Sequence, residues 1–161
     1  MAHSRAYIGV IGPSECTEAE YLLAQEVGSL IARSGAVLVT GGRGGVMEAA
    51  SRGARESGGL TIGILPGLDR ASGNRYLDVV IPTGLGSARN AIVVSASDAL
   101  IAISGGYGTL SEIGLALKAG RAVVGLNTWQ VLPQGRGGDP IIRASSAAQA
   151  VTLALGHTTP G

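Results

Sequence analysis

Short, almost uninterrupted apolar runs alternate with amphipathic stretches along this chain, and this alternation limits the possible folds most strongly. Apolar runs cover residues 6–11, 36–40, 60–65, 78–81, 99–104 and 122–126, and helical patterns cover 17–34, 45–57, 87–97, 109–119 and 145–155. Strands that are apolar along their whole length are typical of a parallel sheet with helices on both faces. Right-handed crossovers then predict an α/β fold, a Rossmann-like doubly wound three-layer sandwich with a mainly parallel sheet. We expect residues 1–161 to form one domain.

The composition excludes several classes of chemistry. Cys16 is the only cysteine and Lys118 the only lysine, while His3 and His157 are the only histidines. An intrachain disulfide, a cysteine-rich metal site and a Ser-His-Asp triad are therefore not expected. Lys118 follows no glycine loop, which excludes a Walker A motif, and it lies in a helical pattern that gives no support to pyridoxal chemistry. We expect no metal site and no required cofactor, and chemistry that comes from arginine, carboxylates, hydroxyls and backbone amides.

The charge and hydropathy pattern bears on partners and compartment. Charged residues make up 14% of the chain and the formal net charge is +1, which gives no electrostatic basis for nucleic-acid binding. No apolar run is long enough to span a membrane, and the first residues lack the apolar core of a signal peptide. We therefore expect a cytoplasmic protein without nucleic-acid or membrane partners.

Two strand ends share one pattern, in which an apolar run and a hydroxyl residue precede Gly-Gly-x-Gly and a helix. The first turn contains Gly41, Gly42 and Gly44, and the second contains Gly105, Gly106 and Gly108. Glycine lets a ligand approach the backbone closely, and the free amides at a helix start bind anions. Ligands of doubly wound folds bind beyond the carboxyl ends of the strands. We predict that the two turns, on neighbouring strands, hold one phosphate from two sides; the alternative is that they only form tight turns.

The usual dinucleotide fingerprint is missing from both turns. Neither turn completes Gly-x-Gly-x-x-Gly, and Thr40 ends the second strand where an acidic residue would bind ribose. A mononucleotide or another compact phosphate compound therefore fits the pattern better than NAD does.

Several side chains near these turns are candidates for ligand contacts. Arg89 lies at a helix start, where a cation opposes the helix dipole, so a role in pairing with an anion in the cleft is favoured. Asn90 is a candidate helix cap or ligand donor. Arg43 is either a phosphate clamp or a solvated loop residue, and Ser14 either contacts the ligand or turns the chain. Thr109 follows the second glycine turn and is expected to help hold the phosphate.

Glu112 has two interpretations. With Thr109 it repeats the Thr-x-x-Glu spacing of Thr17 and Glu20, which is the pattern of a helix capping box. Alternatively, Glu112 faces the cleft and engages sugar hydroxyls or acts as an acid or base. The sequence leaves both interpretations open.

Three motifs together resemble a known superfamily. They are GGRGGVMEAA at 41–50, SARN at 87–90 and SGGYGTLSE at 104–112. These residues resemble the LONELY GUY (LOG)-like Rossmann superfamily, whose members are often mislabelled as lysine decarboxylases. The resemblance covers about residues 6 to 126.

Two branches of this superfamily are relevant. The cytokinin-activating branch cleaves a nucleoside 5′-monophosphate into free base and ribose 5-phosphate, and the resemblance implies that Arg89 and Glu112 match its catalytic residues. Here Asn90 replaces the lysine of that branch, and Ser104 replaces the proline that precedes its glycines. The sequence is closer to the second branch, the molybdenum-cofactor carrier proteins and their bacterial relatives.

The resemblance to the carrier branch implies a pocket for a small phosphorylated ligand. The bound molecule would be a nucleotide, phosphate or molybdenum cofactor, and the protein would be a homodimer or homotetramer. We therefore predict a binding or carrier protein, with a LOG-type phosphoribohydrolase as the alternative.

Overall fold

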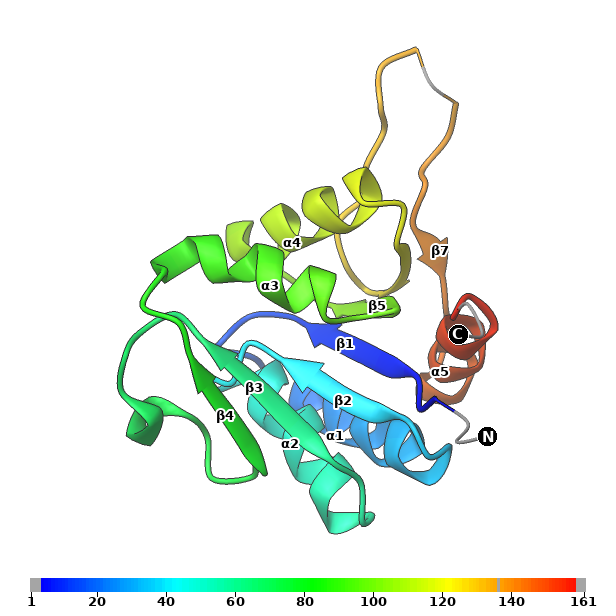
Figure 1. Cartoon of the computed structure of the whole chain (residues 1–161). Coiled ribbons are helices and arrows are strands. Elements are labelled where there is room, and N and C mark those ends of the chain that lie inside the picture. The colour runs from blue at the N-terminus through cyan, green and yellow to red at the C-terminus, as the bar shows by residue number, and fades with distance from the viewer. Residues whose placement is uncertain (1–3, 136, 159–161) are drawn as a thin grey trace.

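The computed structural model describes residues 4–135 and 137–158 and contains one seven-stranded sheet (Figure 1). Its strands are β1 (Tyr7–Ile11), β2 (Val37–Thr40), β3 (Thr61–Leu65), β4 (Val79–Pro82), β5 (Ala99–Ile103), β6 (Ala122–Leu126) and β7 (Ile142–Arg143). They lie in the order β4-β3-β2-β1-β5-β6-β7, and every neighbouring pair is parallel. The order reverses between β1 and β5, which places a topological switch point at the centre of the sheet.

Helices cover both faces of the sheet and complete three layers (Figure 1). They are α1 (Glu18–Arg33), α2 (Val46–Glu56), α3 (Asn90–Ser95), α4 (Tyr107–Lys118) and α5 (Ala147–Gly156). The first core cluster joins α1, α2 and α5 to the sheet, and the second joins α3 and α4 to its other face. The predicted Rossmann-like sandwich is thereby confirmed. None of the helices within the described residues has both the length and the apolar character that a membrane crossing requires.

The strand order corrects one expectation from the sequence. The two glycine turns follow β2 and β5, which are not neighbours, because β1 pairs with both of them. The segment after β1 therefore lies between the two turns. Chain order gave no information on this point, since β5 is placed beside β1 only by the long-range pairing of the sheet.

The helix starts correct a second expectation. The capping box of Thr17 and Glu20 is present, with both reciprocal hydrogen bonds. Of the two interpretations left open for Glu112, the capping box with Thr109 is not the one observed, because α4 begins at Tyr107 and its N-cap is Gly106. Glu112 lies in the second turn of α4 and is free to face another element.

Two glycines bring α1 and α2 into backbone contact. A Cβ at Gly28 would lie 2.0 Å from the Ala50 carbonyl oxygen, and one at Gly53 would lie 1.9 Å from the Gln25 carbonyl oxygen. Neither carbonyl belongs to a flexible side chain, so a larger residue would push the helices apart. This contact fixes the position of α2, whose first turn follows the first glycine turn.

This contact makes a stability prediction with an internal control. We expect Gly28→Ala to lower the free energy of unfolding by about 1–3 kcal/mol, because overpacking displaces backbone. Gly114→Ala, on an exposed helical position where no atom beyond the helix's own backbone and chain neighbours lies within 4 Å of the added methyl group, should raise the free energy of unfolding by roughly 0.5–1 kcal/mol. Urea unfolding of both variants measures the difference. Equal effects of the two substitutions would contradict the close contact of α1 with α2.

Candidate functional site

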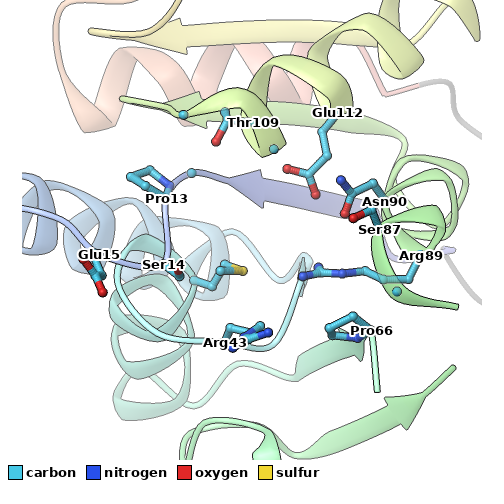
Figure 2. A pocket seen from close by; sticks show the side chains of 15 residues that line it. Pro13, Ser14, Glu15, Arg43, Pro66, Ser87, Arg89, Asn90, Thr109 and Glu112 are labelled. Atoms are coloured by element: carbon cyan, nitrogen blue, oxygen red, sulfur yellow. The ribbon is translucent and has the colours of Figure 1, made fainter. Parts of the chain in front are cut away.

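A cavity of about 640 Å³ opens beyond the carboxyl ends of the central strands (Figure 2). Its lining comes from the turn after β1, from α2 and the turn before it, from the end of β3, from the 3₁₀ turn that leads into α3, and from the start of α4. The lining residues are Gly12, Pro13, Ser14, Glu15, Arg43, Met47, Pro66, Gly86, Ser87, Arg89, Asn90, Gly106, Gly108, Thr109 and Glu112. The cavity lies at the topological switch point, where doubly wound folds place their ligands.

The structure brings most of the predicted side chains together. The predicted residues that line the cavity are Ser14, Arg43, Arg89, Asn90, Gly106, Gly108, Thr109 and Glu112. The predicted glycines that are not among the lining residues are Gly41, Gly42, Gly44 and Gly105. Sequence reasoning missed Gly12, Pro13, Glu15, Met47, Pro66, Gly86 and Ser87. The rule that ligands bind beyond strand ends pointed to the segments after β1 and β3, but no motif marked their residues.

The start of α4 is open toward the cavity. The amides of a first helical turn have no acceptor within the helix, and the N-cap Gly106 makes no side-chain cap hydrogen bond. Apart from its chain neighbours and the backbone of its own helix, a Cβ at Gly106 or Gly108 would find no atom within 4 Å, so the backbone here borders free space. Thr109 is buried and directs its hydroxyl into the cavity (Figure 2). This wall therefore offers hydrogen-bond donors and the positive end of a helix dipole.

The first glycine turn differs, because the protein's own backbone occupies it. The amide of Val46, at the start of α2, donates to the Pro13 carbonyl at 3.0 Å. A Cβ on the N-cap Gly45 would lie 2.4 Å from the same carbonyl oxygen. The amide of Gly42 donates to the Thr40 hydroxyl at 3.1 Å. This turn therefore contributes the Arg43 side chain to the cavity rather than a second set of free amides.

Thr40 also bears on the type of nucleotide. The residue is fully buried, and its hydroxyl accepts the Gly42 amide. No acidic side chain stands at this strand end, where a dinucleotide-binding fold holds ribose hydroxyls. The geometry thus agrees with the sequence in disfavouring an ordinary NAD site.

Arg89 is the most unusual group in the cavity. Its residue is only 8% exposed, and its Nε is buried without a hydrogen-bond partner among the described residues. The ion pairs found in that part of the chain involve Arg52, Arg55 and Arg143 instead. Figure 2 shows the Arg89 side chain reaching across the cavity toward the wall that carries Arg43.

Gly41 makes room for this guanidinium. A Cβ at Gly41 would lie 1.8 Å from Nη1 of Arg89, so any larger residue would displace the side chain. Burial lowers the pKa of Arg89, the nearby Glu112 carboxylate opposes that shift, and Arg43 adds to it. A guanidinium nevertheless remains protonated in proteins. The cavity therefore holds a buried positive charge that the described side chains do not fully compensate.

Glu112 faces Arg89 from the opposite wall (Figure 2). The residue is 7% exposed, and burial raises the pKa of its carboxyl group to about 7, against the smaller opposing effect of Arg89. Near neutral pH the group therefore exists in both protonation states, and it can donate a hydrogen bond or accept a proton. Asn90 donates from Nδ2 to the Ser111 hydroxyl at 3.0 Å and so ties α3 to α4.

Residues 4–135 and 137–158 contain no group of three or more His, Cys, Asp or Glu side chains that could hold a metal ion. The chemistry of this cavity rests on two guanidinium groups, one carboxyl group with a raised pKa, hydroxyl groups and backbone amides.

Comparisons with known proteins identify relatives over nearly the whole chain. The model of the SLOG cluster4 family matches residues 5–154. The solved structure of the molybdenum cofactor binding protein from Rippkaea orientalis is similar at a TM-score of 0.88 and 42% identity, covering 97% of this chain and 99% of that one. The molybdenum cofactor carrier protein from Chlamydomonas reinhardtii is similar at a TM-score of 0.83 and 38% identity, covering 96% and 98%.

A curated enzyme is also similar over part of its length. The cytokinin riboside 5′-monophosphate phosphoribohydrolase of Mycobacterium tuberculosis is 41% identical over 101 residues, which are 60% of this chain and 54% of the enzyme. The chain thus spans about half the length of this curated relative.

The raised pKa of Glu112 predicts a pH-dependent stability. Between its ordinary value of 4.5 and about 7, the folded state retains a proton that the unfolded state releases. The free energy of unfolding therefore falls as the pH rises through this window, by about 3 kcal/mol in total. Glu112→Gln removes the titrating group. The difference in free energy of unfolding, variant minus wild type, should therefore increase by about 3 kcal/mol between pH 4.5 and 7.5 in urea unfolding. Glu26→Gln, on the exposed face of α1, is the control, and an advantage of Glu112→Gln that stays constant with pH would contradict the burial effect.

Proposed function

The chain belongs to the SLOG cluster4 family, and from this membership we propose that it binds or carries a small phosphorylated ligand. The ligand class is a nucleotide or a pterin phosphate of the molybdenum cofactor type. The observation that carries the proposal is the buried guanidinium of Arg89, whose Nε has no partner in the described part of the chain. A buried cation that is only partly compensated is unfavourable for folding, and an anion that enters the cavity would supply the missing compensation.

The remaining lining supports an anionic ligand of this size. When Glu112 is protonated, Glu15 is the only other carboxyl residue in the lining beside Arg43 and Arg89, and in that state the lining carries an excess of positive charge. The phosphate would lie between these guanidinium groups and the open start of α4. A volume of about 640 Å³ lies within the usual range for small-molecule sites. The rest of the ligand would extend past Ser14 toward the loop that begins at Pro66.

The relatives support the carrier interpretation over other phosphate chemistry. Two solved relatives are described as a binding protein and a carrier protein for molybdenum cofactor. In such a role the cofactor is cargo, and the chain itself requires no resident cofactor. We further propose a homodimer or homotetramer, as the family resemblance implies. From the low net charge and the hydropathy pattern we propose a cytoplasmic location without a nucleic-acid partner.

Titration of the protein tests the binding role of Arg89. We expect wild-type protein to bind AMP or another phosphate compound in calorimetry, and Arg89→Met to weaken that affinity by roughly 10- to 100-fold, because charge-assisted hydrogen bonds are lost. Arg70→Met, in the exposed 3₁₀ turn Arg70–Ser72, is the matched control and should leave the affinity unchanged. Mass analysis of small molecules that copurify with wild-type protein identifies the natural ligand class.

Stability separates this role from a structural one. Without ligand, Arg89→Met should unfold at a urea concentration no lower than the wild type, because it removes a poorly compensated buried charge. A variant that loses stability but keeps its affinity would assign Arg89 to the fold. A wild-type protein that binds no phosphate compound would refute the proposed function.

Phosphoribohydrolase activity is the second candidate, favoured by the placement of Glu112 beside Arg89 in one cavity. In that reaction the sugar carbon becomes positively charged as the base departs, and Glu112 would stabilise this charge or activate water. If the protein is a carrier, incubation with AMP should release no adenine above the buffer control in chromatography. Release of adenine that Glu112→Gln abolishes would establish the hydrolase instead.

A further inference from the structure

The second glycine turn is held from outside the cavity by the loop between β6 and β7. The Thr128 hydroxyl donates to the Ser104 carbonyl at 2.5 Å, and Nε1 of Trp129 donates to the Gly106 carbonyl at 3.1 Å. The indole ring also packs against the turn, since a Cβ at Gly105 would lie 3.1 Å from Cδ1 of Trp129. None of the donors belongs to the cavity lining.

The segment that carries these donors is itself anchored to the sheet. Arg143, in β7, donates to the carbonyls of Thr128 and Trp129 and pairs with Asp139. The ring of Tyr107, the first residue of α4, lies 5.9 Å from the Trp129 ring. The loop therefore reaches the glycine turn as a fixed element at this point.

The first glycine turn has a corresponding support from the loop between β3 and β4. The backbone amide of Asn74 donates to the Gly42 carbonyl at 2.9 Å, and Nδ2 of Asn74 donates to the Arg43 carbonyl at 3.0 Å. The Asn74 side-chain oxygen accepts the Tyr76 amide at 3.1 Å, which orients the side chain. Each glycine turn is thus bound at two carbonyls by loop residues that do not line the cavity.

These contacts matter because glycine turns are intrinsically mobile. The carbonyl and amide of one peptide unit share a plane, so fixing a carbonyl also fixes the direction of the amide that follows it. Ser104 has φ of +55°, an unfavourable backbone conformation that needs support from its surroundings. A turn held in advance loses less conformational entropy when an anion binds.

We propose that Trp129 and Thr128 on the second turn, and Asn74 on the first, are positioning residues of the anion site. They hold the backbone of Gly106 and the base of the Arg43 side chain in the geometry that receives the ligand. This inference rests on the proposed binding function, and it assigns a share of the affinity to three loop residues that do not line the cavity.

Amide hydrogen exchange in the free protein tests the support directly. Trp129→Phe keeps an aromatic ring but removes the donor to Gly106, and should raise exchange in the segment 104–110 by about 3- to 10-fold. Thr128→Val removes the donor to Ser104 with little change in shape and should raise exchange in the same segment by a similar factor. It is the second test variant, which decides the result if Trp129→Phe folds poorly. Leu132→Ala, at an exposed position of the same loop, is the matched control and should leave this exchange unchanged.

Calorimetric titration with AMP tests the consequence for binding. Trp129→Phe, Thr128→Val and Asn74→Ala should each weaken the affinity by about 3- to 10-fold, and Leu132→Ala should not.

The outcomes separate this inference from the proposed function. Exchange that matches the wild type in both loop variants overturns the support, whatever the titration gives. If the wild type binds AMP, and the variants show faster exchange but bind AMP with unchanged affinity, the positioning role is overturned. Failure of the wild type to bind any phosphate compound refutes the proposed function first, and the positioning role falls with it.

Discussion

The buried guanidinium of Arg89 is the charge around which the cavity is arranged. Gly41 has no side chain where Nη1 lies, and Glu112 opposes the desolvation of the cation without forming an ion pair with it in the described structure. Burial raises the pKa of Glu112, and the attraction of the Arg89 guanidinium offsets only part of that shift. Both groups would be better hydrated in the unfolded chain, so the site is a local source of instability.

The surrounding structure offsets this instability with apolar packing. The strands under the cavity are almost completely buried, and fully buried residues such as Ile11, Ile101 and Ile103 fill the space on the two faces of the sheet. The backbone contact between α1 and α2 adds a rigid support for the turn that carries Arg43. A polar, strained cavity edge on a rigid apolar sheet is a common arrangement. Binding sites require buried charges and strained backbone that lower the stability of the fold, and apolar packing elsewhere offsets this cost.

The sequence was informative where local rules act and uninformative where distant segments meet. Continuous apolar strands predicted the parallel sheet, and the Thr17 capping box formed as expected. The Thr109 box failed because Gly106 starts the helix earlier, and a Thr-x-x-Glu spacing alone does not locate an N-cap. The separation of the glycine turns by β1, and the closure of the first turn by the Pro13 carbonyl, depend on strand order and could not be derived from either motif. The same limit hid the supporting contacts of Trp129, which lies far from the turn in sequence.

The backbone at Ser104 bears most directly on the choice between carrying and cleaving a ligand. Its φ of +55° lies in a region closed to proline, whose ring holds φ near −65°. The turn observed here therefore cannot accept the proline that stands at this position in the cytokinin-activating branch without a change of backbone path. Asn90 points the same way, since it replaces a lysine of that branch and uses its amide to bind Ser111. The resemblance implies that Glu112 and Arg89 match the acid and the arginine of the cleaving branch, whereas the turn at Ser104 and the residue at Asn90 differ from that branch. These differences support the proposal that the chain binds its ligand without hydrolysing it.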